Sequence, residues 1–272
     1  MRHSKIKLLV SDLDGTMLDS SGRIPNRNIE AVRAAMERGV KVTLCTGRMY
    51  SSARKFAETL GITDVPLICY NGSMIRGMDG VTALHLKLDM ETARGLLALF
   101  RERGIYVQSY IDDELYIKDP DDDDFVNYTR HFGMLGRPVG DALYEPLTEP
   151  TKLLAKTAGI EASHALIREL SGRFGKKLYI TSSNEDFVEM MNPEAGKGRC
   201  LAKLAEMLSI PMKNVMAMGD GENDAGMIRA AGAGAAMANG RESALAAADW
   251  TAPSNDECGA ALAIEHFILN RP

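Results

Sequence analysis

Residues 6–16 read IKLLVSDLDGT, a short apolar run followed directly by an acidic turn that contains a glycine. The apolar part does not alternate with polar residues, which is typical of a strand buried on both faces of a sheet. Helical spacing follows over Pro25–Arg38, with Gly39 as a C-terminal cap, and Val40–Cys45 repeats the apolar run. Strand, helix and strand in this order predict a βαβ unit in a parallel sheet.

The same alternation continues toward residue 80 and returns in the last third of the chain. The further strands expected are Leu67–Tyr70, Asn214–Met218, Ala233–Met237 and the stub Trp250-Thr251, and the further helices are Ser51–Leu60, Gly198–Leu208, Asn223–Ala231, Arg241–Ala248 and Gly259–Leu269. Together these elements predict an α/β fold with a Rossmann-like parallel sheet covered by helices.

Residues 84–190 have a different texture, in which helices are mixed with closely spaced strand-like runs. The helices expected here are Asp89–Arg103 and His164–Phe174, and the strands are Ile105–Ile111, Glu114–Lys118, Lys152–Thr157, Leu178–Ser182 and Phe187–Met191. Strands this close in sequence predict a mixed α+β unit. We therefore expect a discontinuous core domain of residues 1–83 and 191–272, and an α+β domain inserted over residues 84–190.

The composition is that of a globular protein. The 272 residues carry 32 Lys and Arg against 37 Asp and Glu, a net charge of −5, and 45% are apolar. A mildly acidic chain is a poor candidate for nucleic-acid binding. Four cysteines without CxxC spacing suit a reducing compartment. The N-terminal run does not have the features of a secretory signal, and no stretch is long enough for a membrane helix, so we expect a cytoplasmic protein with no membrane partner.

Polar residues stand where three of the predicted strands end, the edge at which open α/β sheets bind ligands. They form the segments Asp12-Leu13-Asp14-Gly15-Thr16, Thr46-Gly47-Arg48 and Gly219-Asp220-Gly221-Glu222-Asn223-Asp224. Carboxylates gathered there are the oxygen ligands that Mg²⁺ prefers, and a metal beside a carboxylate lets that carboxylate attack a phosphoryl group. The Thr46 hydroxyl and the Gly47 N–H suit phosphate oxygens, and Lys197 is the best candidate to balance the phosphoryl charge.

These segments, with Lys197-Gly198, resemble in order and spacing the four motifs of the haloacid dehalogenase (HAD) superfamily. The long insertion between the second and third motifs is similar to that of the Cof-like phosphatases, which carry a type IIB cap. The resemblance covers the whole chain, including Asn71-Gly72-Ser73 and Ser254-Asn255-Asp256-Glu257, with a small departure at Cys258-Gly259, where the family often has Asp-Gly. It implies an HAD core with an inserted cap, and Mg²⁺-dependent hydrolysis of small phosphate esters such as sugar phosphates, pyridoxal phosphate or flavin mononucleotide.

The resemblance also implies roles for single residues. Asp12 would be the nucleophile that forms an aspartyl-phosphate, and Asp14 the general acid and then the general base. Thr46 would hydrogen-bond the phosphoryl group and Lys197 would neutralise it. The other implied contacts are Gly47, Arg48, Asn71 and Asn223 for the substrate, and Asp12, the backbone carbonyl of Asp14, Asp220 and Asp224 for the metal.

Several alternatives stay open at this stage. Arg48 either contacts the substrate or pairs with a neighbouring acid. The same aspartyl-phosphate chemistry serves a phosphotransferase or phosphomutase, and an acid beside Mg²⁺ also suits a phospho-accepting module that does not turn over. The acidic run 119–124 lacks the ligand spacing of a calcium loop, so we interpret it as a solvated turn and helix start. The sequence indicates neither the substrate nor the oligomeric state.

Overall fold

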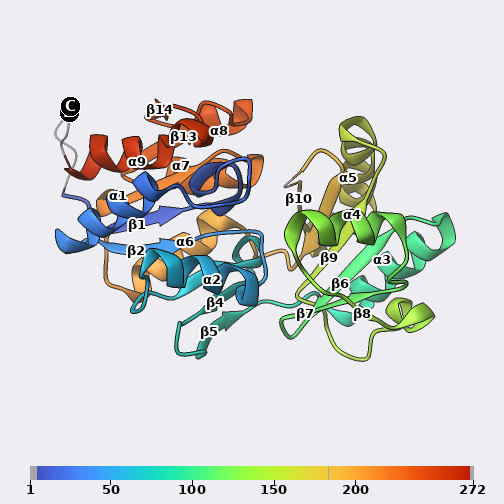
Figure 1. Ribbon diagram of the computed structural model, residues 1–272. Helices are drawn as coiled ribbons and strands as arrows, with labels where there is room; N and C mark the ends of the chain where they lie inside the picture. Colours follow the sequence, from blue (N-terminus) through green and yellow to red (C-terminus); the bar gives the residue numbers. More distant parts are fainter. Residues whose placement is uncertain (1–4, 183, 270–272) are drawn as a thin grey trace. The chain divides into compact units, whose positions relative to one another are not determined.

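The computed structural model describes residues 5–182 and 184–269. The chain divides into two compact units. The core unit is formed by both ends of the chain, up to Leu84 and from Gly196 onward, and the inserted unit is His85–Ala195. The predicted α/β fold with an inserted α+β unit is confirmed (Figure 1).

A five-stranded sheet forms the centre of the core unit, in the order β14-β13-β12-β1-β2. Its strands are β1 (Leu8–Ser11), β2 (Lys41–Leu44), β12 (Val215–Gly219), β13 (Ala233–Met237) and β14 (Trp250–Ala252). Every neighbouring pair is parallel, so the carboxyl ends of all five strands lie at one edge. β1 and β12 are buried along their whole length, as their continuous apolar runs predict.

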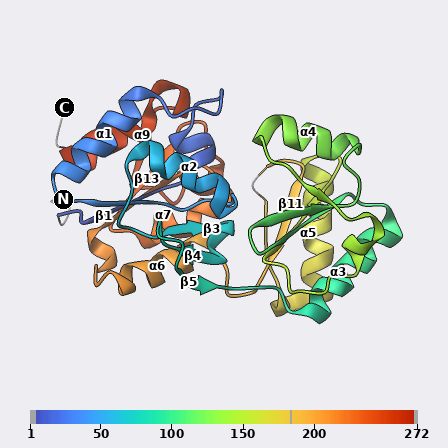
Figure 2. The ribbon, with the colours of Figure 1, turned by 60° about the horizontal axis from the view of Figure 1, so that its bottom comes forward.

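Helices cover both faces of this sheet (Figures 1 and 2). They are α1 (Asn26–Glu37), α2 (Tyr50–Leu60), α6 (Lys197–Met207), α7 (Ala225–Ala230), α8 (Glu242–Leu245) and α9 (Gly259–Ile264), with short helical turns η1 (Leu13–Met17), η2 (Tyr70–Gly72), η5 (Met212–Asn214), η6 (Glu222–Asp224), η7 (Asn255–Glu257) and η8 (Glu265–Leu269). Apolar side chains of α6 and α7 pack on one face, whereas α1 and α9 contact each other on the opposite face.

The third predicted strand is shorter than expected. It ends as β3 (Leu67–Cys69) because the next two residues, Tyr70 and Asn71, both have a φ of 52°, which no strand accommodates. β3 pairs with β4 (Met74–Arg76), which pairs with β5 (Thr82–His85), in a second sheet that the sequence pattern did not indicate. A single parallel bridge between Cys45 and Ile68 places β3 beside the end of β2.

The inserted unit has its own six-stranded sheet, in the order β10-β11-β9-β6-β7-β8. The strands are β6 (Val107–Ile111), β7 (Glu114–Ile117), β8 (Arg137–Pro138), β9 (Lys152–Lys156), β10 (Tyr179–Thr181) and β11 (Phe187–Met191), and the helices are α3 (Met90–Arg103), α4 (Asp123–Phe132), α5 (Ile160–Phe174) and the turns η3 (Gly140–Tyr144) and η4 (Gly175–Lys177). Apolar residues of α3 and α5 pack on one face of this sheet, and α4 contacts the other through Tyr128.

The acidic run 119–124 is a turn and a helix start, as interpreted. The Asp122 carboxylate accepts hydrogen bonds from the backbone N–H groups of Asp124 (2.9 Å) and Phe125 (3.4 Å), and so caps α4. In the part of the chain that the structure describes, none of the helices has the length and apolar character needed to cross a bilayer.

Candidate active site

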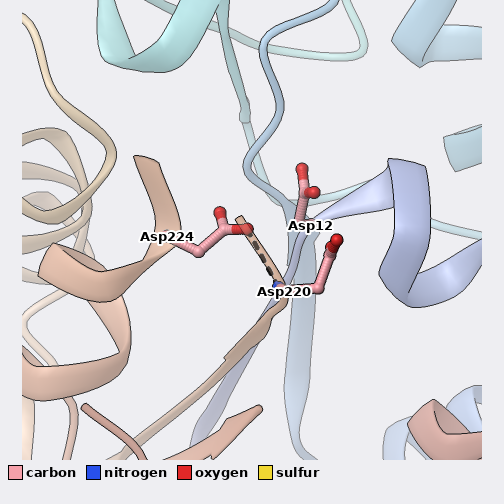
Figure 3. A group of neighbouring side chains, drawn as sticks. All are labelled: Asp12, Asp220 and Asp224. Carbon is pink, nitrogen blue, oxygen red and sulfur yellow. Dashed lines mark hydrogen bonds between the residues drawn. The ribbon is translucent and has the colours of Figure 1, made fainter. Parts of the chain in front are cut away.

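The core unit brings acidic side chains together where two adjacent strands end. Asp12 follows β1 and Asp220 follows β12, and the Asp12 N–H donates to the Met218 carbonyl at 3.0 Å, which continues the pairing of the two strands. Asp224 returns to the same place from the turn after Asp220. One carboxylate oxygen from each of Asp12, Asp220 and Asp224 lies within 4.8 Å of the others (Figure 3). We call these three residues the acid cluster.

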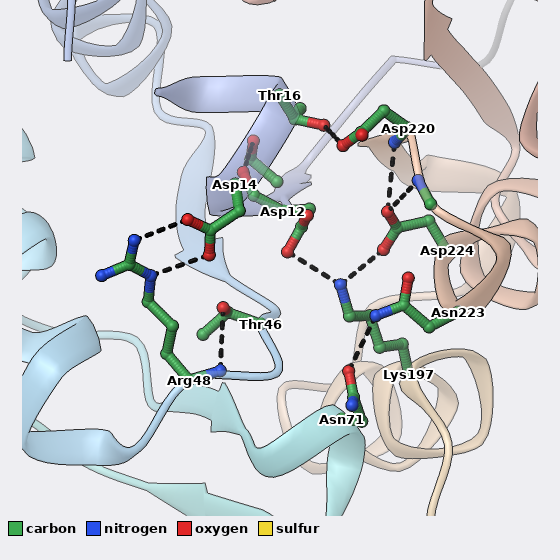
Figure 4. A network of polar contacts seen from close by, with 12 residues as sticks. Asp12, Asp14, Thr16, Thr46, Arg48, Asn71, Lys197, Asp220, Asn223 and Asp224 are labelled. Carbon is green, nitrogen blue, oxygen red and sulfur yellow. Dashed lines mark hydrogen bonds and ion pairs between the residues drawn. The ribbon is translucent and has the colours of Figure 1, made fainter. Parts of the chain in front are cut away.

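Lys197 is the cation in contact with this cluster (Figure 4). It is the first residue of α6, and only 1% of its surface is exposed. Its Nζ donates to Asp12 Oδ1 at 2.7 Å and to Asp224 Oδ1 at 2.6 Å. Because a helix N-terminus disfavours a cation, and burial does so too, these carboxylates account for the position of the ammonium group.

The loops around the cluster fix its carboxylates. Asp224 Oδ2 accepts hydrogen bonds from the backbone N–H groups of Asp220 (3.1 Å) and Gly221 (2.8 Å). Thr16 Oγ1 donates to Asp220 Oδ1 at 2.7 Å. Gly15 has a φ of +74°, and a Cβ there would lie 2.3 Å from Asp220 Oδ2. Both the backbone conformation and the lack of space therefore require glycine at this position.

The cluster holds more negative than positive charge. The three carboxyl groups share one ammonium group, which contacts Asp12 and Asp224, in a largely buried site. Burial, and next the charge of Asp224, raise the pKa of Asp12 well above its usual value and that of Asp220 to about 7. Burial opposes the charge of Lys197, but Asp12 and Asp224 outweigh it and raise the pKa of the ammonium group. Such uncompensated negative charge is what a bound divalent cation would neutralise.

Asp14, predicted as the general acid and base, lies outside the acid cluster. Its carboxylate forms a two-point ion pair with Arg48, with Nε to Oδ2 at 2.7 Å and Nη2 to Oδ1 at 2.5 Å (Figure 4). The Arg48 guanidinium also lies 5.0 Å from the centre of the Phe56 ring. Arg48 therefore pairs with an acid in this structure, which is one of its two predicted roles. The other role, a contact with the substrate, stays a prediction.

The other predicted phosphate and substrate contacts lie on the loops after β2, β3 and β12. Thr46 is buried, and its hydroxyl accepts the N–H of Arg48 at 3.2 Å. Asn223 Nδ2 donates to Asn71 Oδ1 at 2.9 Å, which links the loop after β12 to that after β3. A Cβ on Gly47 would lie 3.1 Å from the same Asn71 oxygen, so little room remains for a larger residue.

Two site residues, Thr16 and Asn239, had no predicted role. Thr16 is the last residue of the acidic turn 12–16, and its position in that motif was the one feature of the sequence that could have indicated a role. Asn239 Nδ2 donates to the Gly15 carbonyl at 2.9 Å, and its Oδ1 accepts the N–H of Asn255 at 2.9 Å. Asn255 in turn donates to the Leu18 carbonyl at 2.8 Å, so the late segment 254–257 supports the turn that carries Asp12 and Asp14.

Comparisons with known proteins identify the family of this chain. A family model described as haloacid dehalogenase-like hydrolase matches residues 9–264. A 5-amino-6-(5-phospho-D-ribitylamino)uracil phosphatase of Bacillus subtilis is 31% identical, over 97% of this chain and 96% of its own length. A pyridoxal phosphate phosphatase of Escherichia coli is 28% identical, over 89% of this chain and 92% of its own length.

Solved structures give the same picture of the fold. A haloacid dehalogenase-like hydrolase from Bacteroides thetaiotaomicron superimposes with a TM-score of 0.86 at 29% identity, over 97% of this chain and 100% of its own. A sugar phosphatase of HAD subclass IIB superimposes with a TM-score of 0.84 at 22% identity, over 96% of this chain and 98% of its own. At that identity the second likeness concerns the fold alone.

Proposed function

Since this chain belongs to the haloacid dehalogenase-like hydrolases, and within them to the Cof-like phosphatases, we propose that it is a Mg²⁺-dependent phosphomonoesterase that acts through an aspartyl-phosphate on Asp12. One observation carries this proposal. Three carboxylates converge at adjacent strand ends around a single buried lysine, and their charge is not balanced within the site.

The residues present fit a hard divalent cation. All three members of the acid cluster offer oxygen ligands, and Mg²⁺ uses few protein carboxylates because it keeps several waters. We assign Asp12, Asp220 and Asp224 as the side chains that hold the metal, with the Asp14 backbone carbonyl as a further ligand. When bound, Mg²⁺ supplies positive charge that reduces the repulsion between a carboxylate nucleophile and a phosphate dianion.

Asp12 is the best-placed nucleophile. Lys197 binds its Oδ1, which leaves Oδ2 to attack phosphorus and form the aspartyl-phosphate, while the bond from phosphorus to the ester oxygen breaks and the protonated leaving group departs as an alcohol. Lys197 stays beside the transferring group and balances its charge. The Thr46 hydroxyl and the Gly47 N–H are the proposed hydrogen-bond donors to the phosphoryl oxygens.

Asp14 has the role of moving protons. In the first step its carboxyl group gives a proton to the leaving oxygen. In the second step its carboxylate takes a proton from the water that attacks the aspartyl-phosphate. Arg48 orients this carboxylate in the structure, and Asp14 has to part from Arg48 on at least one oxygen to reach the substrate.

Small phosphorylated metabolites are the proposed substrate class. The relatives named above act on a phosphorylated ribitylaminouracil and on pyridoxal phosphate, and we extend this class, with sugar phosphates and flavin mononucleotide, to the present chain. The inserted unit is proposed to act as a cap that excludes water and selects the substrate. The buried thiols of Cys45, Cys69 and Cys200 suit a cytoplasmic location.

A phosphate-release assay tests this function. The purified chain is incubated with a panel of phosphorylated metabolites and Mg²⁺, with no added acceptor, and orthophosphate is measured. We expect release from several esters, abolished by EDTA and by Asp12→Asn. Transfer of the phosphoryl group to an added sugar without net release would favour the phosphotransferase, and a phosphorylated protein without turnover would favour the phospho-accepting module.

A further inference from the structure

The inserted unit contains a pocket of about 440 Å³ on the face of its sheet that packs against α3. Strands β6 and β7 form one side, and η3 with the loop after it forms the other. The lining residues are Ser109, Ile111, Tyr116, Val139, Ala142, Leu143, Glu145, Pro146, Leu147 and Thr148. This volume is within the range of small-molecule sites, which are mostly apolar with a few polar groups.

Ser109 is the polar group that this pocket leaves unsatisfied. The residue is 1% exposed, and its Oγ has no hydrogen-bond partner among the residues that the structure describes. Its neighbours on β6 differ: Gln108 Nε2 donates to the Tyr106 hydroxyl at 2.8 Å, and Gln108 Oε1 accepts from Tyr110 at 2.8 Å. A buried hydroxyl without a partner is unfavourable, and of the four such hydroxyls among the described residues, Ser109 is the one in the lining of this pocket, so it offers a ligand there one hydrogen bond.

The charge of the pocket argues against a phosphate. Its lining includes no Lys or Arg, and its one ionisable carboxylate is that of Glu145. The Tyr116 hydroxyl donates to Glu114 at 2.8 Å. An anionic ligand would find no cation in the lining itself, and Arg101, which lies 3.8 Å from Glu145, already pairs with Glu145 and Asp141. The acid cluster differs, because it has its proposed metal and Lys197.

The apolar residues of the lining indicate that most of the ligand is apolar. Leu147 is 94% exposed, so an apolar molecule in the pocket would cover part of this side chain. We propose that the pocket binds a small, uncharged, mainly apolar molecule that places one hydrogen-bonding group on Ser109 Oγ. This would be a second ligand site, separate in chemistry from the phosphate site.

Two probes of equal shape test this proposal. p-Cresol and p-xylene differ by one hydroxyl in place of a methyl group, and the binding of each to the full chain is measured by ligand-observed NMR. We expect millimolar binding of both, with p-cresol bound about fivefold tighter because its hydroxyl meets Ser109. Excess orthophosphate with Mg²⁺ should leave p-cresol bound.

Three variants locate the binding. Ser109→Ala should remove the preference for p-cresol while leaving p-xylene affinity unchanged. Ala142→Trp, at an exposed position on the lining, should weaken both probes at least about tenfold by filling the pocket. Ala165→Trp, at an exposed position on α5 outside the lining, is the matched control and should change neither.

Four results would overturn the proposal: equal affinity of the two probes for the wild-type chain, no binding of either at about 10 mM, binding unaffected by Ala142→Trp, or displacement of p-cresol by orthophosphate.

Discussion

Each unit of this protein buries a lysine beside a carboxylate, and the two sites differ in their balance of charge. Lys197 of the core unit contacts Asp12 and Asp224, with Asp220 close by. Lys152 of the inserted unit donates to Glu189 at 2.8 Å, and its Nζ lies 4.5 Å from the centre of the Tyr110 ring. Both lysine side chains are at most 4% exposed.

This difference in charge balance distinguishes the Lys152–Glu189 pair, which is structural, from the acid cluster, which is a site for chemistry. Lys152 and Glu189 neutralise each other across β9 and β11, so this pair is complete without a ligand. The acid cluster is not complete, because three carboxylates share one lysine. Excess buried charge is costly unless something neutralises it, which makes the acid cluster a site for a cation and leaves the Lys152 pair a part of the sheet.

Removing one carboxylate from each site should give the largest contrast. Asp12→Asn should lower phosphate release by at least about 10³-fold, since it removes the nucleophile. It should not destabilise the fold, because burial, and next the charge of Asp224, raise the pKa of Asp12, and an uncharged side chain avoids both costs. Glu189→Gln should keep the activity but lower the free energy of unfolding by about 3–5 kcal/mol, because it leaves Lys152 buried without its carboxylate.

Both variants are measured by orthophosphate release and by urea unfolding. A near-wild-type rate for Asp12→Asn would show that another residue is the nucleophile. A folded but inactive Glu189→Gln protein would show that the second pair takes part in the reaction, and the contrast would fail.

Replacing each lysine should sharpen the same comparison. Lys197→Met and Lys152→Met should each cost about 3–5 kcal/mol, since each leaves buried acids uncompensated. Joint replacement of Lys152 by Met and Glu189 by Leu should restore most of that stability and retain activity. Joint replacement of Lys197 and Asp224 should not restore activity, whatever its effect on unfolding. An active enzyme without Lys197 would contradict the proposed charge balance.

Metal addition should act on one site only. At 100 times its dissociation constant, Mg²⁺ should raise the free energy of unfolding by about 2.7 kcal/mol. Asp220→Asn should remove most of this gain, whereas Glu189→Gln should retain it. The measurement is urea unfolding in Mg²⁺ against EDTA. An equal gain in Asp220→Asn would place the metal elsewhere.

The smallest effect is expected from a residue that supports the cluster. Thr16→Val removes the hydroxyl that donates to Asp220, so Mg²⁺ affinity should fall about tenfold while the rate at saturating Mg²⁺ changes little. Thr43→Val is the matched control, because the buried Thr43 hydroxyl donates to the Pro66 carbonyl, away from the acid cluster. If Thr16→Val and the wild-type chain bind Mg²⁺ with equal affinity, the Thr16 hydroxyl does not support metal binding by Asp220.

Sequence reasoning identified the acid cluster because its signal is local. Asp12 and Asp220 each follow a continuous apolar strand, and parallel strands deliver such residues to one edge. The strand order, the roles of Thr16 and Asn239, and the second sheet depend on contacts between distant segments. β4 is only three residues long, and no residue of β5 is buried, so neither has the continuous apolar run that indicated β1.

The Lys152 pair was also outside the reach of the sequence. Lys152 and Glu189 are 37 positions apart, and they meet only because β9 pairs with β11 in one particular register. A shift of one residue would send the two side chains to opposite faces of the sheet. For Arg48, a pair with a neighbouring acid was one of two alternatives, and the sequence did not identify Asp14 as that acid. Residue types alone do not decide between an acid and a substrate as the partner of an arginine.

The proposed function requires that Asp12 becomes phosphorylated during turnover, and acid-quench mass spectrometry detects this phosphorylation. The Asp14→Asn variant is mixed with Mg²⁺ and p-nitrophenyl phosphate, whose leaving group needs no acid, and is then quenched and digested. We expect the peptide that carries Asp12 to gain the mass of one phosphoryl group, only with Mg²⁺, because the base for the second step is missing. Continued orthophosphate release with no phosphorylated peptide, or a phosphoryl group on another residue, would contradict it.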